Sequence, residues 1–243
     1  MTEYSEILKD INIQIYADGA DLEEMRIVRE QGYVSGFTTN PTLMKKAGVT
    51  DYFEFAKHAT KIANGLPISF EVFTDDIEEM VEQASTLSAL GDNIYVKIPV
   101  MNTKGQMTYP IIERLDKMGV NLNVTAVFTV DQVQQILQCV SGNTRHIISV
   151  FAGRIADTSV DPLVIMNESL TKIREHSQNI KLLWASPREI LNLYQADNMG
   201  CDIITITPSL LSKLKLRNKN LHEFSRETVL MFYNDALESG FKI

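Results

Sequence analysis

The stretch Asn93-Ile94-Tyr95-Val96-Lys97-Ile98-Pro99 alternates as a β-strand does and carries a lysine near its end. Ile94, Val96 and Ile98 fall on one face, so Tyr95 and Lys97 share the other face. A lysine in a buried strand is unusual, because its ammonium group loses hydration there. Burial also lowers the pKa of an amine, and a neutral amine can attack a carbonyl to form a Schiff base. The stretch therefore predicts a buried strand and raises the question of covalent carbonyl chemistry.

Short β-branched runs recur on both sides of this strand and alternate with longer amphipathic segments. The expected strands cover residues 11–18, 36–40, 67–73, 93–99, 121–128, 146–152, 181–186 and 203–208. The expected helices cover residues 21–32, 42–64, 75–91, 104–119, 129–140, 160–177, 187–199 and 209–216, and a last helix covers 220–238. Such alternation indicates parallel βαβ units. Eight units favour an α/β fold closed as a (β/α)8 TIM barrel over an open doubly wound sheet, because Gly19 alone does not make a phosphate loop.

The whole chain, residues 1–243, is expected to form one barrel domain, with residues 218–243 as a C-terminal helical extension. A length of 243 residues is ordinary for one such barrel. The sequence shows no internal repeat and no linker rich in proline or glycine. The extra helix at 220–238 carries several large apolar side chains, namely Phe224, Val229, Met231, Phe232 and Leu237. This helix could close one end of the barrel or pack on a neighbouring subunit.

Composition narrows the functional class. A net charge of −8 argues against a general nucleic-acid-binding surface. No apolar stretch approaches the roughly 18 residues that span a bilayer, and residues 1–6 lack the basic and apolar regions of a secretion signal. Cys139 and Cys201 match no metal-ligand spacing and are expected to be buried thiols in a reducing compartment. We therefore expect a cytoplasmic protein without nucleic-acid or membrane partners.

Strand parity predicts a polar barrel interior. The helix layer needs the apolar face of each strand, so the other face must point inward. In residues 121–128, for example, the apolar face holds Leu122, Val124 and Ala126 and is expected to meet the helices. The converging polar residues are Gln14, Asp18, Ser69, Glu71, Lys97, Asn123, Thr125 and Ser149. Buried polar groups need partners or a chemical role, and the C-terminal ends of the strands carry the active site in such barrels.

This set suits aldol chemistry on a lysine. A lysine that forms an imine needs a proton shuttle, and cleavage of the neighbouring C–C bond needs a base for the substrate hydroxyl. Asp18 and Glu71 are carboxylates placed to serve, one directly and one through a water. The residues that could hold substrate hydroxyls or that water are Thr38, Asn40, Asn123 and Thr125. Arg154 and Arg188 follow the sixth and seventh strands and could together bind a phosphate. The chemistry requires neither a metal nor an organic cofactor.

Each of these residues also has a simpler structural interpretation. Lys97 and Glu71, on adjacent strands, could form only an ion pair. Asp18 could cap the helix expected at 21, although Asp21 is the better candidate for that N-cap. Each arginine taken singly could be a surface residue. Asn40-Pro41 could be only a turn that opens a helix. The histidines His58, His146, His176 and His222 are expected to be structural or exposed, and Trp184 is expected to pack in the interior.

Seven sequence motifs, taken in order, resemble those of the transaldolase family. They extend from about residue 11 to about residue 217 and so cover nearly the whole barrel. The Thr-Thr-Asn-Pro block at 38–41 and the lysine strand are specific when they occur together. The motifs are Ala17-Asp18-Gly19-Ala20-Asp21, Thr38-Thr39-Asn40-Pro41-Thr42-Leu43, Tyr95-Val96-Lys97-Ile98-Pro99, Asn123-Val124-Thr125-Ala126-Val127-Phe128, Ser149-Val150-Phe151-Ala152-Gly153-Arg154, Ala185-Ser186-Pro187-Arg188 and Thr205-Ile206-Thr207-Pro208.

The resemblance implies a class I mechanism, in which Lys97 forms the Schiff base and Asp18 is the acid and base. It implies that Glu71 works with a catalytic water beside Thr125. The expected substrate-binding residues are Thr38, Asn40, Asn123, Ser149 and Phe151, and the expected phosphate-binding residues are Ser149, Arg154 and Arg188. The implied reaction transfers a dihydroxyacetone unit from sedoheptulose 7-phosphate or fructose 6-phosphate to glyceraldehyde 3-phosphate or erythrose 4-phosphate. It belongs to the pentose phosphate pathway and uses no cofactor.

Two positions bear on the branch of the family. Fructose-6-phosphate aldolases resemble transaldolases but carry glutamine in place of the strand-3 glutamate and tyrosine at the end of strand 5. This chain has Glu71 and Phe128, which favours transaldolase, because a carboxylate can activate a water that a glutamine cannot. The family's second arginine motif usually reads Ser-Phe-Arg, whereas this chain reads Ser186-Pro187-Arg188-Glu189. A negative charge beside the expected anchor leaves the substrate preference open.

Two alternatives to a transaldolase remain at this point. One is an aldolase that releases free dihydroxyacetone, and the other is a non-catalytic barrel that binds sugar phosphates. The resemblance also implies a homo-oligomer, as a pentamer or decamer, in which the helix at 220–238 reaches onto a neighbour.

Overall fold

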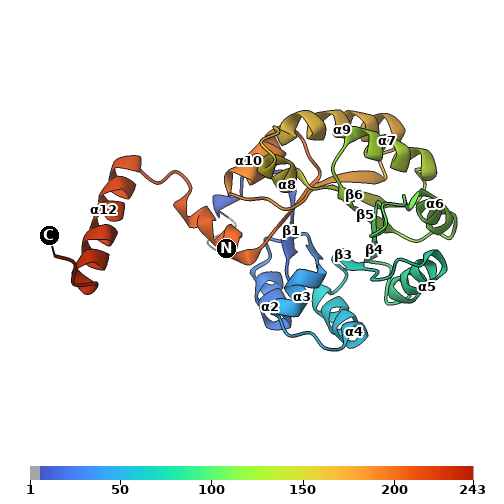
Figure 1. The fold of residues 1–243 in the computed structure, drawn as a ribbon, viewed down its shortest axis with the longest axis horizontal. Coiled ribbons are helices and arrows are strands. Elements are labelled where there is room, and N and C mark those ends of the chain that lie inside the picture. The colour runs from blue at the N-terminus through green and yellow to red at the C-terminus, as the bar shows by residue number, and fades with distance from the viewer. Residues whose placement is uncertain (1–5, 243) are drawn as a thin grey trace.

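Eight parallel strands close into a barrel in their order along the chain, surrounded by helices (Figure 1). The computed structural model describes residues 6–242. The strands are β1 (Gln14–Asp18), β2 (Gly36–Thr38), β3 (Ile68–Glu71), β4 (Ile94–Pro99), β5 (Leu122–Val127), β6 (His146–Val150), β7 (Ile180–Trp184) and β8 (Ile203–Ile206). The predicted (β/α)8 barrel is confirmed, and β8 pairs with β1 to close it.

The helices fill the intervals between the strands. They are α2 (Leu22–Gln31), α3 (Pro41–Lys46), α4 (Tyr52–Ala63), α5 (Ile77–Ser88), α6 (Tyr109–Lys117), α7 (Val130–Cys139), α8 (Ala152–Asp157), α9 (Pro162–His176), α10 (Leu191–Asn198), α11 (Pro208–Leu211), the 3₁₀ helix η1 (Ser212–Leu216) and α12 (Leu221–Glu238). Helix starts follow ordinary capping rules, because Asp21, Asp51 and Asp76 each accept a hydrogen bond from a backbone N–H of the first turn. Asp21 is thus the N-cap of α2, as expected, and Asp18 is left for another role.

Several predicted segments differ from the structure, and the helix expected at 104–119 begins only at Tyr109. The single helix expected at 42–64 is two helices, because Gly48 turns the chain with φ 71° and Asp51 starts α4 anew. The strand expected at 146–152 ends at Val150, since the chain enters the short helix α8 at Ala152. The helix expected at 209–216 is α11 followed by the 3₁₀ helix η1.

Apolar side chains form two cores. The larger core lies between the strands and the helices and includes Trp184, which is fully buried there as expected. A smaller core lies inside the barrel and is built by Tyr16, Ile147, Leu183, Ala185 and Ile203. The interior is therefore apolar in part, and Tyr16, which shares a strand face with Asp18, belongs to that apolar part. The polar residues gather where the strands end.

A bulge in β5 overturns one parity assignment. Ala126 was expected to face the helices, but it has φ 58°, and the register between β5 and β6 shifts between Val124 and Val127. The extra residue turns Ala126 toward the barrel mouth. Bulges of this kind often re-aim side chains beside functional sites.

The helix α12 stands apart from the barrel at the end of the chain (Figure 1). None of its residues, all of which are described, is buried. Its exposed apolar side chains include Leu221, Phe224, Val229, Leu230, Met231, Phe232, Tyr233 and Leu237. Within residues 6–242, no helix is long and apolar enough to cross a membrane. The expectation of no secretion signal concerns residues that lie mainly outside the described range.

Candidate active site

A cavity of about 400 Å³ opens at the C-terminal ends of the strands. Ten residues predicted for the site line it, namely Asp18, Thr38, Asn40, Glu71, Lys97, Asn123, Thr125, Ser149, Phe151 and Arg154. Lining residues that sequence reasoning gave no role are Pro41, Thr42, Leu43, Ala126, Leu183, Ala185, Ser186 and Thr205. Arg188 does not line it. The structure therefore brings together the predicted set with one exception, while the chemical roles of the residues stay predictions.

Lys97 lies on the floor of this cavity and is only 7% exposed. Its Nζ lies 3.0 Å from Oε2 of Glu71, the residue beside it in the strand register. It also donates a hydrogen bond of 2.8 Å to the carbonyl oxygen of Thr39. An ammonium group has three N–H donors, so these two contacts hold the lysine and leave one donor position unused on a side chain that lines the cavity. The ion pair foreseen as a structural alternative thus exists, but it borders open space.

Asp18 faces the same cavity from β1. Its Oδ1 accepts a hydrogen bond of 2.8 Å from the hydroxyl of Thr38, and Nδ2 of Asn40 lies 3.3 Å from its Oδ2. Burial raises the pKa of Asp18, and the nearby charge of Glu71 raises it further. The charge of Lys97 and the bonds from Thr38 and Asn40 oppose this rise without cancelling it. Asp18 is therefore a carboxyl group with an elevated pKa, which suits a group that exchanges protons.

Asn40 both caps a helix and faces Asp18. Its Oδ1 accepts the backbone N–H of Leu43 at 3.0 Å and so starts α3. Because the oxygen is committed to the helix, the amide nitrogen must point toward the carboxylate. The helix-start interpretation and the site interpretation of Asn40 are therefore both correct as descriptions of its contacts.

Asn123 is held between two serines. Ser149 on β6 donates to its Oδ1 at 2.6 Å, and its Nδ2 donates to the Ser69 hydroxyl at 3.0 Å. All three residues are buried. The two serines hold the amide at both ends, and its NH₂ group keeps a second N–H for a ligand. Ser69 was expected in the interior, and the structure gives it the role of orienting Asn123.

Comparison with known proteins agrees with this geometry. Residues 15–242 match the sequence profile of the family described as Transaldolase/Fructose-6-phosphate aldolase. A "Probable transaldolase" of Thermoanaerobacter sp. (strain X514) is 32% identical over 231 residues, which are 95% of this chain and 100% of that protein. A "Probable transaldolase" of Thermoplasma volcanium is 35% identical over 204 residues, which are 83% of this chain and 87% of that protein.

The chain belongs to the transaldolase/fructose-6-phosphate aldolase family.

Solved structures support the fold alone. A dihydrodipicolinate synthase has a TM-score of 0.57 with 13% identity, covering 89% of this chain and 79% of that chain. A 2,3-dimethylmalate lyase has a TM-score of 0.54 with 12% identity, covering 98% of this chain and 97% of that chain. Both similarities are too remote in sequence to carry information about activity.

The two arginines expected at the phosphate site of this family differ in position. Arg154 on α8 lines the cavity, and its guanidinium carbon lies 5.6 Å from the ring centroid of Phe151. Arg188 is directed at Asp157 instead, and its Nε donates to Asp157 Oδ1 at 3.1 Å. Gly153 allows α8 and the loop after β7 to approach each other, because a Cβ there would lie 1.6 Å from the Ser186 carbonyl oxygen.

Phe128, the position that carries tyrosine in the aldolase branch, lies beside the site. Its ring centroid is 5.7 Å from that of Phe151, which lines the cavity. Phe128 itself does not line the cavity, so its link to the site in this structure is its contact with Phe151. Among the described residues, no group of three or more histidine, cysteine, aspartate or glutamate side chains could hold a metal.

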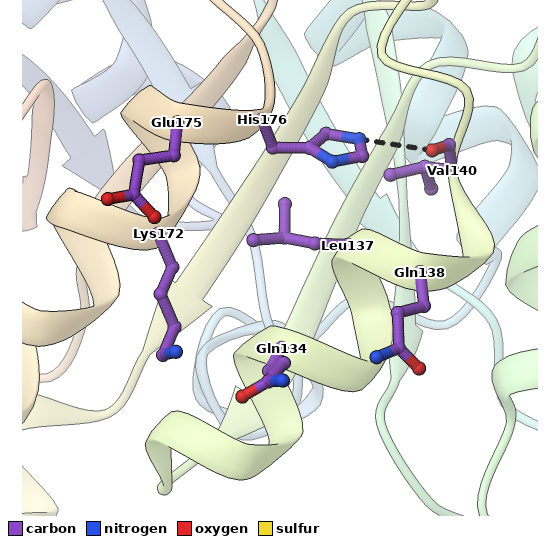
Figure 2. A pocket seen from close by; sticks show the side chains of 7 residues that line it. All are labelled: Gln134, Leu137, Gln138, Val140, Lys172, Glu175 and His176. Atoms are coloured by element: carbon purple, nitrogen blue, oxygen red, sulfur yellow. Dashed lines mark hydrogen bonds between the residues drawn. The ribbon is translucent and has the colours of Figure 1, made fainter.

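A second hollow, of about 430 Å³, lies on the outside between α7 and α9 (Figure 2). The hydrogen bond drawn there joins His176 Nε2 to the Val140 carbonyl oxygen at 3.1 Å. Its two charged side chains, Lys172 and Glu175, both come from α9, and Lys172 extends toward the side of Gln134 (Figure 2). The hollow is similar in size to the barrel cavity but has no converging polar set, so we place the candidate active site in the barrel.

Proposed function

We propose that the protein is a transaldolase that works through an imine on Lys97. The observation that carries the proposal is the cavity in which Lys97 Nζ, paired with Glu71 at 3.0 Å, meets the elevated-pKa carboxyl of Asp18. Membership of the family supports the same assignment. The substrates are a ketose phosphate as donor and an aldose phosphate as acceptor, and the reaction belongs to the non-oxidative pentose phosphate route in the cytoplasm.

The first half of the reaction forms the imine. The neutral amine of Lys97 attacks C2 of the ketose phosphate, and the carbonyl oxygen takes a proton to give a carbinolamine. The carbinolamine loses its hydroxyl as water and leaves a protonated imine. Glu71, which lies next to Nζ, serves these proton transfers through a water beside Thr125.

The second half breaks and remakes a C–C bond. The Asp18 carboxylate removes the proton of the C4 hydroxyl, the C3–C4 bond breaks, and its electron pair moves into the imine to give an enamine. The aldose phosphate leaves with C4 as its new aldehyde. The enamine then attacks the aldehyde of the acceptor, Asp18 returns its proton to the new alkoxide, and water releases the product from Lys97.

Polar groups around the cavity suit the remaining parts of the sugar. Asn123, fixed by its two serines, and Asn40 offer amide groups for hydroxyls. Arg154 supplies a cation at the mouth, and Phe151 supplies an apolar wall. Arg188 can join the phosphate only if it releases Asp157.

Borohydride trapping tests the imine. The protein is incubated with fructose 6-phosphate, reduced with borohydride and mapped by peptide mass spectrometry. We expect a covalent adduct on Lys97 that is absent from Lys97→Met. The matched control is Lys181→Met, which changes the other lysine on a barrel strand, bonded at 2.9 Å to Gln14, and should trap normally. An adduct that persists in Lys97→Met would refute the assignment.

Omission of the acceptor separates transfer from release. A transaldolase should stall without an acceptor aldehyde, whereas an aldolase of the fructose-6-phosphate type should continue to release dihydroxyacetone. The double substitution Glu71→Gln with Phe128→Tyr introduces the residues of the aldolase branch and should raise release relative to transfer. Steady release by the unchanged protein would instead support the aldolase alternative. Tight binding of fructose 6-phosphate with no trappable imine would support a non-catalytic binder.

We also propose that copies of this chain assemble through α12. The helix cannot cover its apolar side chains on its own barrel, since none of its described residues is buried. A second copy is a partner that is always present at equal concentration, and rings of five or ten copies fit the family resemblance. Light scattering should show an oligomer for the full chain and a smaller species for a chain that ends at Asn218. A full chain that is monomeric at micromolar concentration would refute this assembly.

A further inference from the structure

We infer that Thr205, on β8, is a positioning residue that sets the protonation of Asp18 through Thr38. Its Oγ1 lies 2.5 Å from Oγ1 of Thr38, and Thr38 donates at 2.8 Å to Oδ1 of Asp18. The inference rests on the proposed function, because it concerns the residue proposed as the base.

The direction of this relay follows from counting hydrogens. Each threonine hydroxyl has one hydrogen, and an ionised carboxylate only accepts. The hydrogen of Thr38 is therefore committed to Asp18 when Asp18 is ionised. The short contact between the two hydroxyls must then use the hydrogen of Thr205. Thr205 thus donates to Thr38, and Thr38 donates to Asp18.

The relay crosses the seam where the barrel closes. β1 lies between β8 and β2, and Asp18 is in register with Thr38 while Thr205 is in register with Tyr16. Both threonines are buried, with exposures of 6% for Thr205 and 3% for Thr38. In such surroundings a hydrogen bond polarises the next one in the chain and strengthens it. The bond from Thr205 therefore makes Thr38 a better donor and keeps its hydroxyl turned toward the carboxylate.

The hydrogen bonds from Thr205 to Thr38 and from Thr38 to Asp18 stabilise the ionised form of Asp18. Burial raises the pKa of Asp18, whereas the Thr38 hydrogen bond lowers it. The other charged or titratable groups that face the same cavity are Lys97 on β4, Glu71 on β3 and Arg154 on α8. Loss of the Thr205 hydroxyl weakens the bond from Thr38 and leaves those charges in place. The pKa of Asp18 should then rise further, and the base should be available only at higher pH.

Replacement of Thr205 by valine tests the relay, because valine keeps the shape and removes the hydroxyl. Thr205→Ser keeps a hydroxyl at this position and should therefore titrate at Asp18 as the unchanged protein does. The matched control is Thr207→Val, two residues onward, where the hydroxyl contacts Ser209 at 3.1 Å and not the cavity. Thr38→Val removes the final donor and should act at least as strongly as Thr205→Val.

Two readouts keep this inference separate from the proposed reaction. The titration of Asp18 is followed by the ¹³Cγ signal of labelled aspartate, assigned with Asp18→Asn, and needs no activity. The pH profile of kcat/KM is measured in the transfer assay. In Thr205→Val we expect the Asp18 titration and the acid limb of the profile to move up together by about half a unit or more, as partial loss of a bond to a charged group implies.

The outcomes are distinct. If Thr205→Val titrates as the unchanged protein does, and only its unfolding midpoint falls, Thr205 is a packing residue and the inference is wrong. If Thr205→Val does not fold, Thr205→Ser and Thr38→Val decide by the same titration, and unchanged values in both overturn it. If the unchanged protein forms no imine, the proposed function fails, while the carboxyl titration still shows whether the relay operates.

Discussion

Two buried clusters near opposite ends of the barrel use similar groups for different purposes. At the N-terminal end of β6, His146 Nε2 lies 2.7 Å from Asp116 Oδ1, and the Ser141 N–H donates to Asp116 Oδ2 at 2.9 Å. The Leu122 N–H donates to His146 Nδ1 at 3.1 Å, so both ring nitrogens are used and Nε2 carries the hydrogen. At the C-terminal end, Lys97, Glu71 and Asp18 border a cavity of about 400 Å³.

The two clusters differ in whether their polar groups have hydrogen-bonding positions that the protein leaves unused. In the cluster of Asp116 and His146, which we call the lower cluster, each carboxylate oxygen and each ring nitrogen has a protein partner. This cluster can therefore only hold the fold together. Lys97 has two such contacts for its three donor positions, and both Lys97 and Asp18 line the cavity. A buried charge therefore indicates chemistry when its hydrogen bonds are incomplete within the protein and a cavity adjoins it.

The largest expected effect is a loss of turnover after substitution in the upper cluster, which comprises Lys97, Glu71 and Asp18. Lys97→Met removes the proposed nucleophile, and transfer should fall by about 10⁵-fold or more, as with other nucleophile replacements. The free energy of unfolding should fall by about 3 kcal/mol or less, because Glu71 loses its partner but borders the cavity, where water can reach it. A steady-state transfer assay measures the loss of turnover, and urea unfolding measures the change in the free energy of unfolding. Substantial residual turnover would contradict the role given to Lys97.

Substitution in the lower cluster should have the opposite effect, which is a loss of stability without a loss of turnover. His146→Leu leaves the Asp116 carboxylate buried without its main donor, and should lower the free energy of unfolding by about 2–4 kcal/mol. Turnover per folded molecule should remain that of the unchanged protein, because the substitution lies at the other end of β6. Chemical unfolding and active-site titration give the two values. A variant that lost activity but kept its stability would remove the distinction between the clusters.

The lower cluster should also make the fold sensitive to mild acid. Burial holds the pKa of His146 below its ordinary value of 6.5, outweighing its bond to Asp116. The unfolded chain therefore binds a proton below pH 6.5 that the folded chain does not, so stability is lost as pH falls from 6.5 toward the folded pKa. Urea unfolding at about pH 7.5 and about pH 5.5 should show a lower free energy of unfolding at the lower pH. His146→Leu should flatten this dependence, and an unchanged slope would contradict the cause.

The smallest expected effect concerns the arginine held outside the cavity. Asp157→Asn weakens the hold on Arg188, and because the pair is about half exposed the gain is limited to about 1 kcal/mol or less. KM for fructose 6-phosphate should then fall by about fivefold at most, since about 1.4 kcal/mol corresponds to tenfold. The control donor is fructose, whose KM should not change because it has no phosphate. Equal changes for both donors would argue against a phosphate role for Arg188.

Period-two alternation was sufficient to predict most of the site. It assigned Asp18, Glu71, Lys97, Asn123 and Thr125 to one face, because the chain in each strand is regular at those positions. Alternation failed at Ala126, because a bulge needs φ 58° at a residue whose side chain gives no sign of it. Sequence distance likewise concealed the partner of Arg188, since Asp157 lies 31 positions away on α8.

Local patterns predicted the barrel better than they predicted its boundaries. The amphipathic period runs through 42–64, and only Gly48 and Asp51 mark the break between α3 and α4. Thr205 was missed as a site residue because it lies in an Ile-Ile-Thr-Ile run, where β-branched residues are ordinary. Its contact with Thr38 depends on barrel closure, which no single strand reveals.

That closure gives the site an order of assembly during synthesis. Lys97, Glu71 and Asn123 come from three neighbouring strands in the middle of the chain, so they can meet while the ribosome is still translating the C-terminal half. Asp18 belongs to the first strand, but its hydrogen-bonded relay needs residue 205 from the last one. A nascent or truncated chain can therefore carry the lysine long before the aspartate has its final partners. The proposed chemistry of Asp18 therefore needs the completed ring.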